Sequence, residues 1–106
     1  MKVIMDLCVV PIGVGVSLSA YIAACEVVLE KSGLTYKLHA NGTNIEGDWD
    51  TVFDTVKTCH RKVHELGAPR IFTTIKMGTR IDKDQSMAAK IHSVEQKYRA
   101  SGQEQT

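Results

Sequence analysis

The sequence predicts an α+β fold built on a four-stranded antiparallel sheet. Three observations lead to this prediction: a long apolar strand at 2–12, a helical spacing of apolar residues after it, and a repeat of strand and helix signals further along the chain. The predicted order is strand, helix, strand, strand, helix, strand, helix. Two right-handed crossovers joined by one hairpin give a ferredoxin-like βαββαβ arrangement with sheet order 4-1-3-2, plus a C-terminal helix.

Length and composition limit the classes of function. The chain has 106 residues, enough for one domain, of which 43% are hydrophobic and 24% charged. The formal net charge of +1 lacks the positive excess on which nucleic-acid binders depend. No apolar run reaches the roughly 18 to 20 residues that cross a bilayer, and the three cysteines form no CxxC pair. We expect a cytoplasmic protein that binds neither nucleic acid nor membrane.

The first strand and the first helix follow from the apolar spacing. Residues 2–12 are apolar on both alternations, which is typical of a central strand covered on both faces. A helical period then begins near Ser17, the expected N-cap, and Gly33 is expected to end this helix.

A hairpin is predicted at Asn41-Gly42, because Asn-Gly is the preferred pair in a two-residue type I′ turn. The flanking strands are expected at 35–40 and 43–46. A turn of this kind fixes the register of the two strands. The predicted cross-strand pairs are Ala40–Thr43, His39–Asn44, Leu38–Ile45 and Lys37–Glu46.

The second half of the chain repeats the pattern. A helix capped by Asp48 or Asp50 is expected to run to Gly67, followed by a strand at 70–77. Apolar residues at helical spacing then predict a third helix: Met87, Ile91, Val94 and Tyr98. We expect one domain over 1–99 and a frayed tail over 100–106.

The third helix presents one apolar stripe, too narrow to cover a four-stranded sheet. The first strand is nevertheless apolar on both sides. We therefore expect a second copy of the chain to cover the remaining face, in a homodimer or a homotetramer.

Topology is expected to bring polar residues to one end of the sheet. The end of the first strand, the start of the first helix, the hairpin turn and the start of the fourth strand should meet there. Free N–H groups at a helix start favour an acceptor-rich ligand. The residues expected on this rim are Gly13, Gly15, Ser17, His39, Thr43 and Arg70.

His60 and His64 stand four residues apart on the second predicted helix, a spacing that can hold a metal through two imidazoles. The sequence places no third ligand, and a solvated helix face explains the two histidines equally well. We expect no metal site and no cofactor.

Three blocks of sequence resemble the YkoF-like thiamine-binding protein family. They are 11–17, 38–47, and 70–76 together with 80–83, and the likeness spans about residues 2–98. The resemblance implies a ferredoxin-like subunit that assembles into dimers or tetramers. It also implies a non-catalytic protein that binds thiamine (vitamin B1) or its hydroxymethylpyrimidine part.

The ligand-binding residues implied by the resemblance are Gly13, Ser17, His39, Gly42, Thr43 and Glu46. Glu46 suits the aminopyrimidine or the cationic thiazolium, and Tyr21 or Trp49 would face a ring. The two glycines would allow the backbone to approach the ligand closely.

Two functions remain open from the sequence. The first is binding of thiamine as a reservoir, sensor or delivery protein. The alternative is a small-molecule enzyme that uses His39 and Glu46 as acid and base across a subunit interface. A bound ligand without turnover would favour the first.

Overall fold

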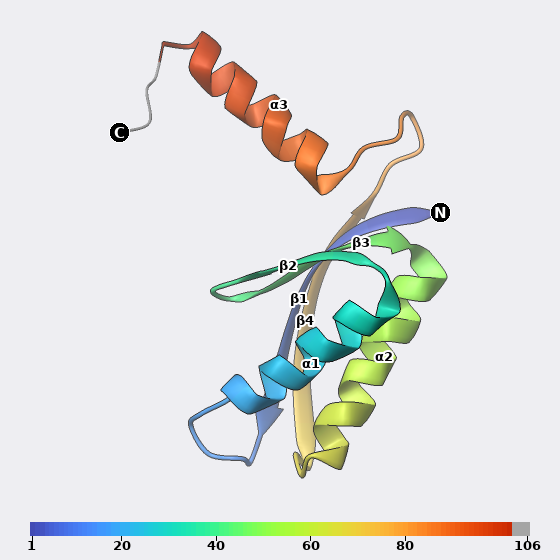
Figure 1. Cartoon of the computed structure of the whole chain (residues 1–106), viewed down its shortest axis with the longest axis vertical. Helices are drawn as coiled ribbons and strands as arrows, with labels where there is room; N and C mark the ends of the chain where they lie inside the picture. The colour runs from blue at the N-terminus through green and yellow to red at the C-terminus, as the bar shows by residue number, and fades with distance from the viewer. Residues whose placement is uncertain (103–106) are drawn as a thin grey trace.

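The structure, a computed structural model that describes residues 1–102, contains one four-stranded sheet and three helices (Figure 1). The elements are β1 (Lys2–Ile12), α1 (Ser19–Ser32), β2 (Thr35–His39), β3 (Gly42–Asp48), α2 (Trp49–Glu65), β4 (Arg70–Thr79) and α3 (Met87–Ala100). The strands are antiparallel in the order β2-β3-β1-β4. The predicted ferredoxin-like arrangement is confirmed.

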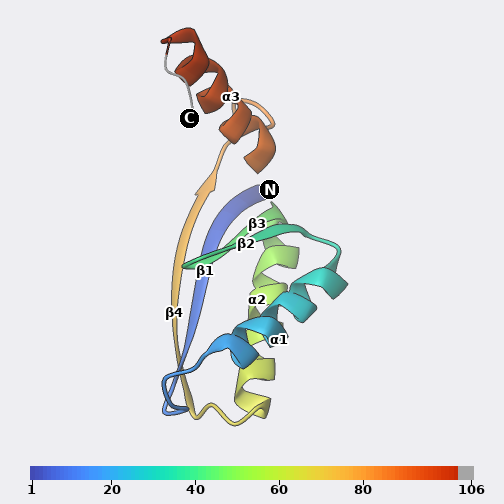
Figure 2. The same ribbon diagram turned by 60° about the vertical axis from the view of Figure 1, so that its left-hand side comes forward.

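The core lies between the sheet and the pair α1 and α2, which cover the same face (Figure 2). Alternate residues of β1 point into this layer because side chains of a strand alternate between faces. Four of them are 5% exposed or less: Val3, Met5, Leu7 and Val9. The helices contribute Cys25, Leu29, Val52, Val56, Cys59 and Val63.

The predicted helix ends are mostly correct. Gly33 ends α1 in a left-handed conformation with φ of 77°, and the Asp48 side chain accepts a hydrogen bond from the Asp50 N–H at the start of α2. The prediction of Ser17 as the N-cap of α1 was wrong. The helix begins at Ser19, with Leu18 in the N-cap position and no side-chain cap.

The hairpin turn lies one residue earlier than predicted. The observed register pairs His39 with Gly42, so the two turn residues are Ala40 and Asn41. Gly42 does not have positive φ and no type I′ turn forms. Glycine is needed at position 42 for a different reason: a Cβ there would lie 2.7 Å from the backbone oxygen of Leu7.

The third helix projects from the end of the sheet instead of lying on it (Figures 1 and 2). None of its residues is buried, and Ile91 and Val94 are 55% and 69% exposed. Within the described residues, no helix has the length and apolar character needed to cross a bilayer. The predicted tail begins inside α3, which includes Ala100, and residues 103–106 lie outside the described part of the chain.

Candidate functional site

The face of the sheet opposite α1 and α2, hereafter the open face, carries the polar side chains that the core excludes. Four polar side chains, one from each strand, form a row across the middle of this face, hereafter the polar row. Asp6 of β1 lies between Asn44 of β3 and Lys76 of β4, and Lys37 of β2 lies beyond Asn44. This row places two cations, a carboxylate and an amide in a line across the sheet.

His39 and Asp6 form a close hydrogen bond on the open face. The Nε2 atom of His39 lies 2.7 Å from Oδ1 of Asp6, and the Asn41 N–H donates to Nδ1 at 3.3 Å. This pattern assigns the imidazole proton to Nε2, from where it is donated to the carboxylate. The ring reaches Asp6 across Gly42, where a Cβ would lie 3.2 Å from Cε1 of His39. Gly42 therefore makes room for this contact.

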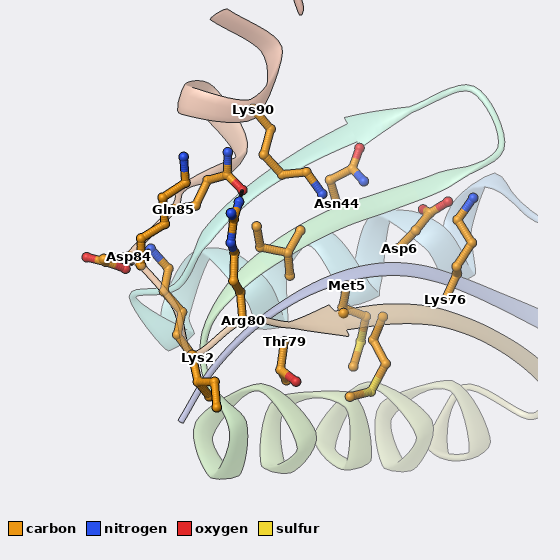
Figure 3. A pocket seen from close by; sticks show the side chains of 15 residues that line it. Lys2, Met5, Asp6, Asn44, Lys76, Thr79, Arg80, Asp84, Gln85 and Lys90 are labelled. Carbon is orange, nitrogen blue, oxygen red and sulfur yellow. Dashed lines mark hydrogen bonds and ion pairs between the residues drawn. The ribbon is translucent and has the colours of Figure 1, made fainter. Parts of the chain in front are cut away.

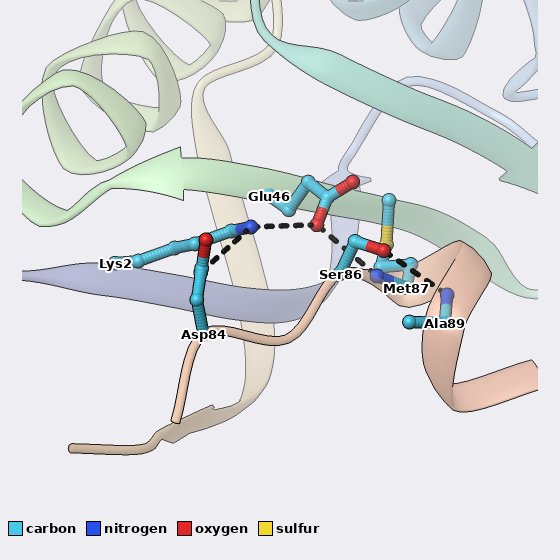
Figure 4. Close-up of polar contacts among 6 residues, drawn as sticks. All are labelled: Lys2, Glu46, Asp84, Ser86, Met87 and Ala89. Carbon is cyan, nitrogen blue, oxygen red and sulfur yellow. Dashed lines mark hydrogen bonds and ion pairs between the residues drawn. The ribbon is translucent and has the colours of Figure 1, made fainter. Parts of the chain in front are cut away.

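Glu46 joins β3 to the start of α3 (Figure 4). Its side chain is 11% exposed, and its Oε2 accepts a hydrogen bond from the Met87 N–H at 3.1 Å. Lys2 Nζ lies 3.6 Å from the same oxygen and 3.6 Å from Oδ1 of Asp84. The predicted pairing of Glu46 with Lys37 was wrong, because the observed register places Thr35 opposite Glu46. Oε2 of Glu46 therefore has two partners, the Met87 N–H and Lys2, whereas Oε1 has no hydrogen-bond partner within the described residues.

A hollow of about 850 Å³ lies between the open face and the segment that leads into α3 (Figure 3). Its volume falls within the range of pockets for small organic ligands, about 300 to 1,000 Å³. Ile4 and Ile81 supply apolar surface, and Asn44 and Asp6 line the side that includes the polar row. The hollow therefore combines an apolar wall with hydrogen-bonding groups.

Thr43 points to the other face of the sheet. It is 5% exposed, and its hydroxyl donates to Oε2 of Glu26 on α1 at 3.0 Å. The second carboxylate oxygen, Oε1, is fully buried without a hydrogen-bond partner among the described residues. Burial raises the pKa of Glu26, and the hydrogen bond from Thr43 opposes this shift. Glu26 is thus a carboxylate between α1 and β3 that has one buried oxygen without a partner and a raised pKa.

The variant Glu26→Gln is expected to raise the free energy of unfolding at neutral pH by about 1 kcal/mol, because it removes the negative charge and a buried charged group costs more than a neutral polar one. The raised pKa means that the folded chain holds a proton that the unfolded chain releases. This group's contribution to stability is therefore complete below its unfolded pKa and lost as the pH rises through its folded pKa. Urea unfolding should show the advantage of the variant shrinking toward acidic pH. An advantage independent of pH would contradict the assignment.

The structure separates the six predicted site residues into three places. His39, Gly42 and Glu46 belong to the open face. Thr43 lies on the helix face, and Gly13 and Ser17 lie in the exposed loop between β1 and α1.

The predicted common rim does not form. The last pair of the β1–β3 ladder is Leu7 with Thr43, whereas β1 continues for five more residues beside β4. At about 3.3 Å per residue, the loop that holds Gly13 lies on the order of 16 Å beyond that pair. The hairpin turn is therefore beside the middle of β1, away from the start of β4 at Arg70.

Two aromatic residues that were expected to face a ligand ring pack on the core instead. Tyr21 and Trp49 belong to the helix side of the sheet, and the ring of Trp49 lies 4.9 Å from that of Phe53. On the open face the exposed aromatic residue is Phe72, paired with Val10.

The two helix histidines have structural partners. His60 Nε2 lies 2.6 Å from the Thr73 hydroxyl, and Nδ1 of His64 lies 2.8 Å from the Ala68 carbonyl oxygen. Burial lowers the pKa of His60, with a smaller effect from the charge of His64. Within residues 1–102 no three side chains of the metal-binding types gather into one group.

Sequence reasoning missed several residues of the open face. Asp6 interrupts an apolar strand, and its alternation with Ile4 and Cys8 was the available signal for a polar site on that face. Nothing in the sequence pairs Lys2 with Glu46, because that contact depends on the register of β1 beside β3. The contact of Lys2 with Asp84 depends on where the segment leading to α3 returns to the sheet.

Comparison with solved structures defines the class of protein. A hypothetical protein of Methanocaldococcus jannaschii has a TM-score of 0.83 at 29% identity, covering 89% of this chain and 96% of that chain. A Thermotoga maritima protein whose name refers to thiamine biosynthesis or salvage has a TM-score of 0.76 at 20% identity, covering 89% and 99%. This chain has the same α+β fold.

Sequence comparison gives the family. Residues 5–95 match the family described as thiamine-binding protein. A UPF0045 protein of Synechocystis is 60% identical over 95 residues, covering 90% of this chain and 78% of the relative. A UPF0045 protein of Eremothecium gossypii is 40% identical over 95 residues, covering 89% and 90%. The chain belongs to the thiamine-binding protein family.

Proposed function

We propose that this chain binds thiamine or its hydroxymethylpyrimidine part without converting it, as a cytoplasmic reservoir, sensor or delivery protein. The site is the open face around the hollow. The observation that carries this proposal is a hollow of suitable size lined by both apolar and hydrogen-bonding side chains, in a chain of the thiamine-binding family.

The chemistry of the open face suits an aminopyrimidine. Such a ring needs both a donor and an acceptor, which the amide of Asn44 supplies from the lining of the hollow. Glu46 lies next to that lining, opposite Ile4, and its Oε1 is a further acceptor at the edge of the hollow. Ile4 lies opposite Glu46 on the neighbouring strand and offers apolar surface for the ring. The Asp6 carboxylate at the edge of the hollow favours the cationic thiazolium.

We further propose that a second copy of the chain covers the open face, so that the ligand lies at or near a subunit interface in a homodimer or homotetramer. Phe72 and Ile12 on this face are 62% and 40% exposed in a single subunit. Exposed apolar groups of this size favour association. The polar row of one copy could also form ion pairs with that of a second copy, because each row holds both a carboxylate and lysines.

An acid–base role for His39 with Glu46 receives less support. His39 pairs with Gly42, four positions from Glu46 along β3, a separation of about 13 Å. Both imidazole nitrogens of His39 already have partners. Incubation with thiamine and its phosphates, followed by mass spectrometry, should reveal no product, and a product would favour the enzyme.

Titration calorimetry with thiamine and with hydroxymethylpyrimidine tests the binding proposal. We expect saturable binding, weakened about tenfold or more in both variants, since Asn44→Ala removes a hydrogen bond to the ligand and Glu46→Gln replaces a charged acceptor with a weaker neutral one. Glu30→Gln, the same chemical change at an exposed position of α1, is the matched control.

The variant Thr43→Val distinguishes the two faces of the sheet. Binding should survive, because Thr43 lies on the helix face with Glu26. Loss of binding in a folded Thr43→Val protein, with normal binding in Glu46→Gln, would move the site beneath the hairpin.

A further inference from the structure

The hollow concentrates positive charge. Its lining includes five cationic side chains and two carboxylates, although the whole chain has a formal net charge of only +1. The cations are Lys2, Lys76, Arg80, Lys83 and Lys90, and the carboxylates are Asp6 and Asp84. A concave surface lined by one sign of charge focuses its field and attracts the opposite charge. The hollow is therefore suited to an anionic group.

Hydrogen bonds to neighbouring side chains fix the guanidinium of Arg80 in the lining of the hollow, where it can contact an anionic group. Its Nη2 donates to Oδ2 of Asp82 at 2.7 Å, and its Nη1 donates to Oε1 of Gln85 at 3.0 Å. The guanidinium has five N–H donors, so some remain for a ligand. The Arg80 hydrogen bond lowers the pKa of Asp82 to about 2, and this pair stays ionised at neutral pH.

Lys90 and Lys83 supply charge that no acid of the described chain neutralises through an ion pair. Lys90 reaches from α3 toward Asn44, and Arg80 points toward Gln85 on the same side of the hollow (Figure 3). Lys76 lies at the opposite side, near Asp6. Lys90 thus lies beside the Asn44 end of the polar row, whereas Arg80 lies on the Gln85 side of the hollow.

We infer that the hollow takes the phosphate esters of its ligand in preference to free thiamine, with the phosphoryl oxygens on Arg80 and Lys90. This inference rests on the proposed function. Thiamine alone brings only a positive thiazolium, which the excess of cations over carboxylates in the lining does not favour. A phosphate on the hydroxyethyl arm brings the negative charge that these groups attract.

Calorimetry with four probes tests this inference: thiamine, thiamine monophosphate, thiamine diphosphate and inorganic pyrophosphate. The diphosphate should bind at least about tenfold more tightly than thiamine at low salt, and added salt should reduce this preference. Lys90→Gln and Arg80→Gln should each weaken diphosphate binding about tenfold and thiamine binding much less. Lys57→Gln makes the same charge change on α2 and should alter neither affinity.

The outcomes separate this inference from the proposed function. Equal affinities for thiamine and its diphosphate, or a diphosphate affinity unchanged in both hollow variants, would overturn the phosphate preference and leave thiamine binding intact. Binding of pyrophosphate as tight as that of the diphosphate, with no binding of thiamine, would overturn the proposed function and this inference with it.

Discussion

Replacing Gly42 with alanine is expected to destabilise the fold by about 2 to 3 kcal/mol, within the range for overpacking. The added Cβ would lie 2.7 Å from the Leu7 backbone oxygen and 3.1 Å from Oδ1 of Asp6. The first of these atoms belongs to the central strand and cannot move away as a side chain can. The hairpin would therefore separate from β1, and the contact between His39 and Asp6 would break. Urea unfolding of the purified variant measures the loss.

Gly78→Ala is the matched control for this change. Gly78 also belongs to the sheet and lies opposite Ile4 on the open face, but a Cβ there meets no atom within 4 Å. We expect its free energy of unfolding to stay within about 0.5 kcal/mol of the parent protein. If both variants lost the same stability, the close approach at Gly42 would not be the cause.

Phe72→Glu is expected to dissociate the proposed assembly into folded single subunits. Burying a phenylalanine contributes about 1.5 to 3 kcal/mol, and an isologous interface contains the change twice. The dissociation constant should therefore rise by roughly two to four orders of magnitude. Light scattering after size-exclusion chromatography should give the mass of one subunit for the variant and a multiple of it for the parent.

The fold of the variant should be unaffected, because Phe72 is already 62% exposed in the single subunit. Circular dichroism checks this point. Val27→Glu introduces the same charge on α1, at a residue that is 47% exposed on the other layer of the molecule, and should leave the mass unchanged. Dissociation by Val27→Glu alone would place the interface on the helices.

The sequence was sufficient for the topology because apolar spacing is a local signal that the core then reinforces. The strand 2–12 was predicted with the observed bounds, and Gly33 and Asp48 were predicted at their helix ends. The predicted position of the hairpin turn was wrong by one residue, because a glycine at position 42 can be explained either by a tight turn or by the close approach of another strand. A turn is visible from neighbouring residues, whereas close approach to Leu7 depends on a strand 35 positions away in the chain.

The candidate site was harder to predict, since it depends on register and on long-range contacts. Thr43 and Glu46 were placed in one site on the basis of the family resemblance, but three positions along a strand reverse the face. Lys2 and Glu46 meet only because β1 and β3 are antiparallel neighbours, and the Met87 N–H joins them through the return of α3. Such contacts leave no local pattern.

The exposed position of α3 has a consequence for how this subunit folds. A helix of 14 residues without a buried side chain is near the length at which isolated helices are only marginally stable in water. Its hydrogen bond to Glu46 fixes where it starts, but the rest of its length receives little support from its own sheet. We expect the ordering of this arm to depend on the surface that meets it, so that part of the secondary structure would form only in the proposed assembly.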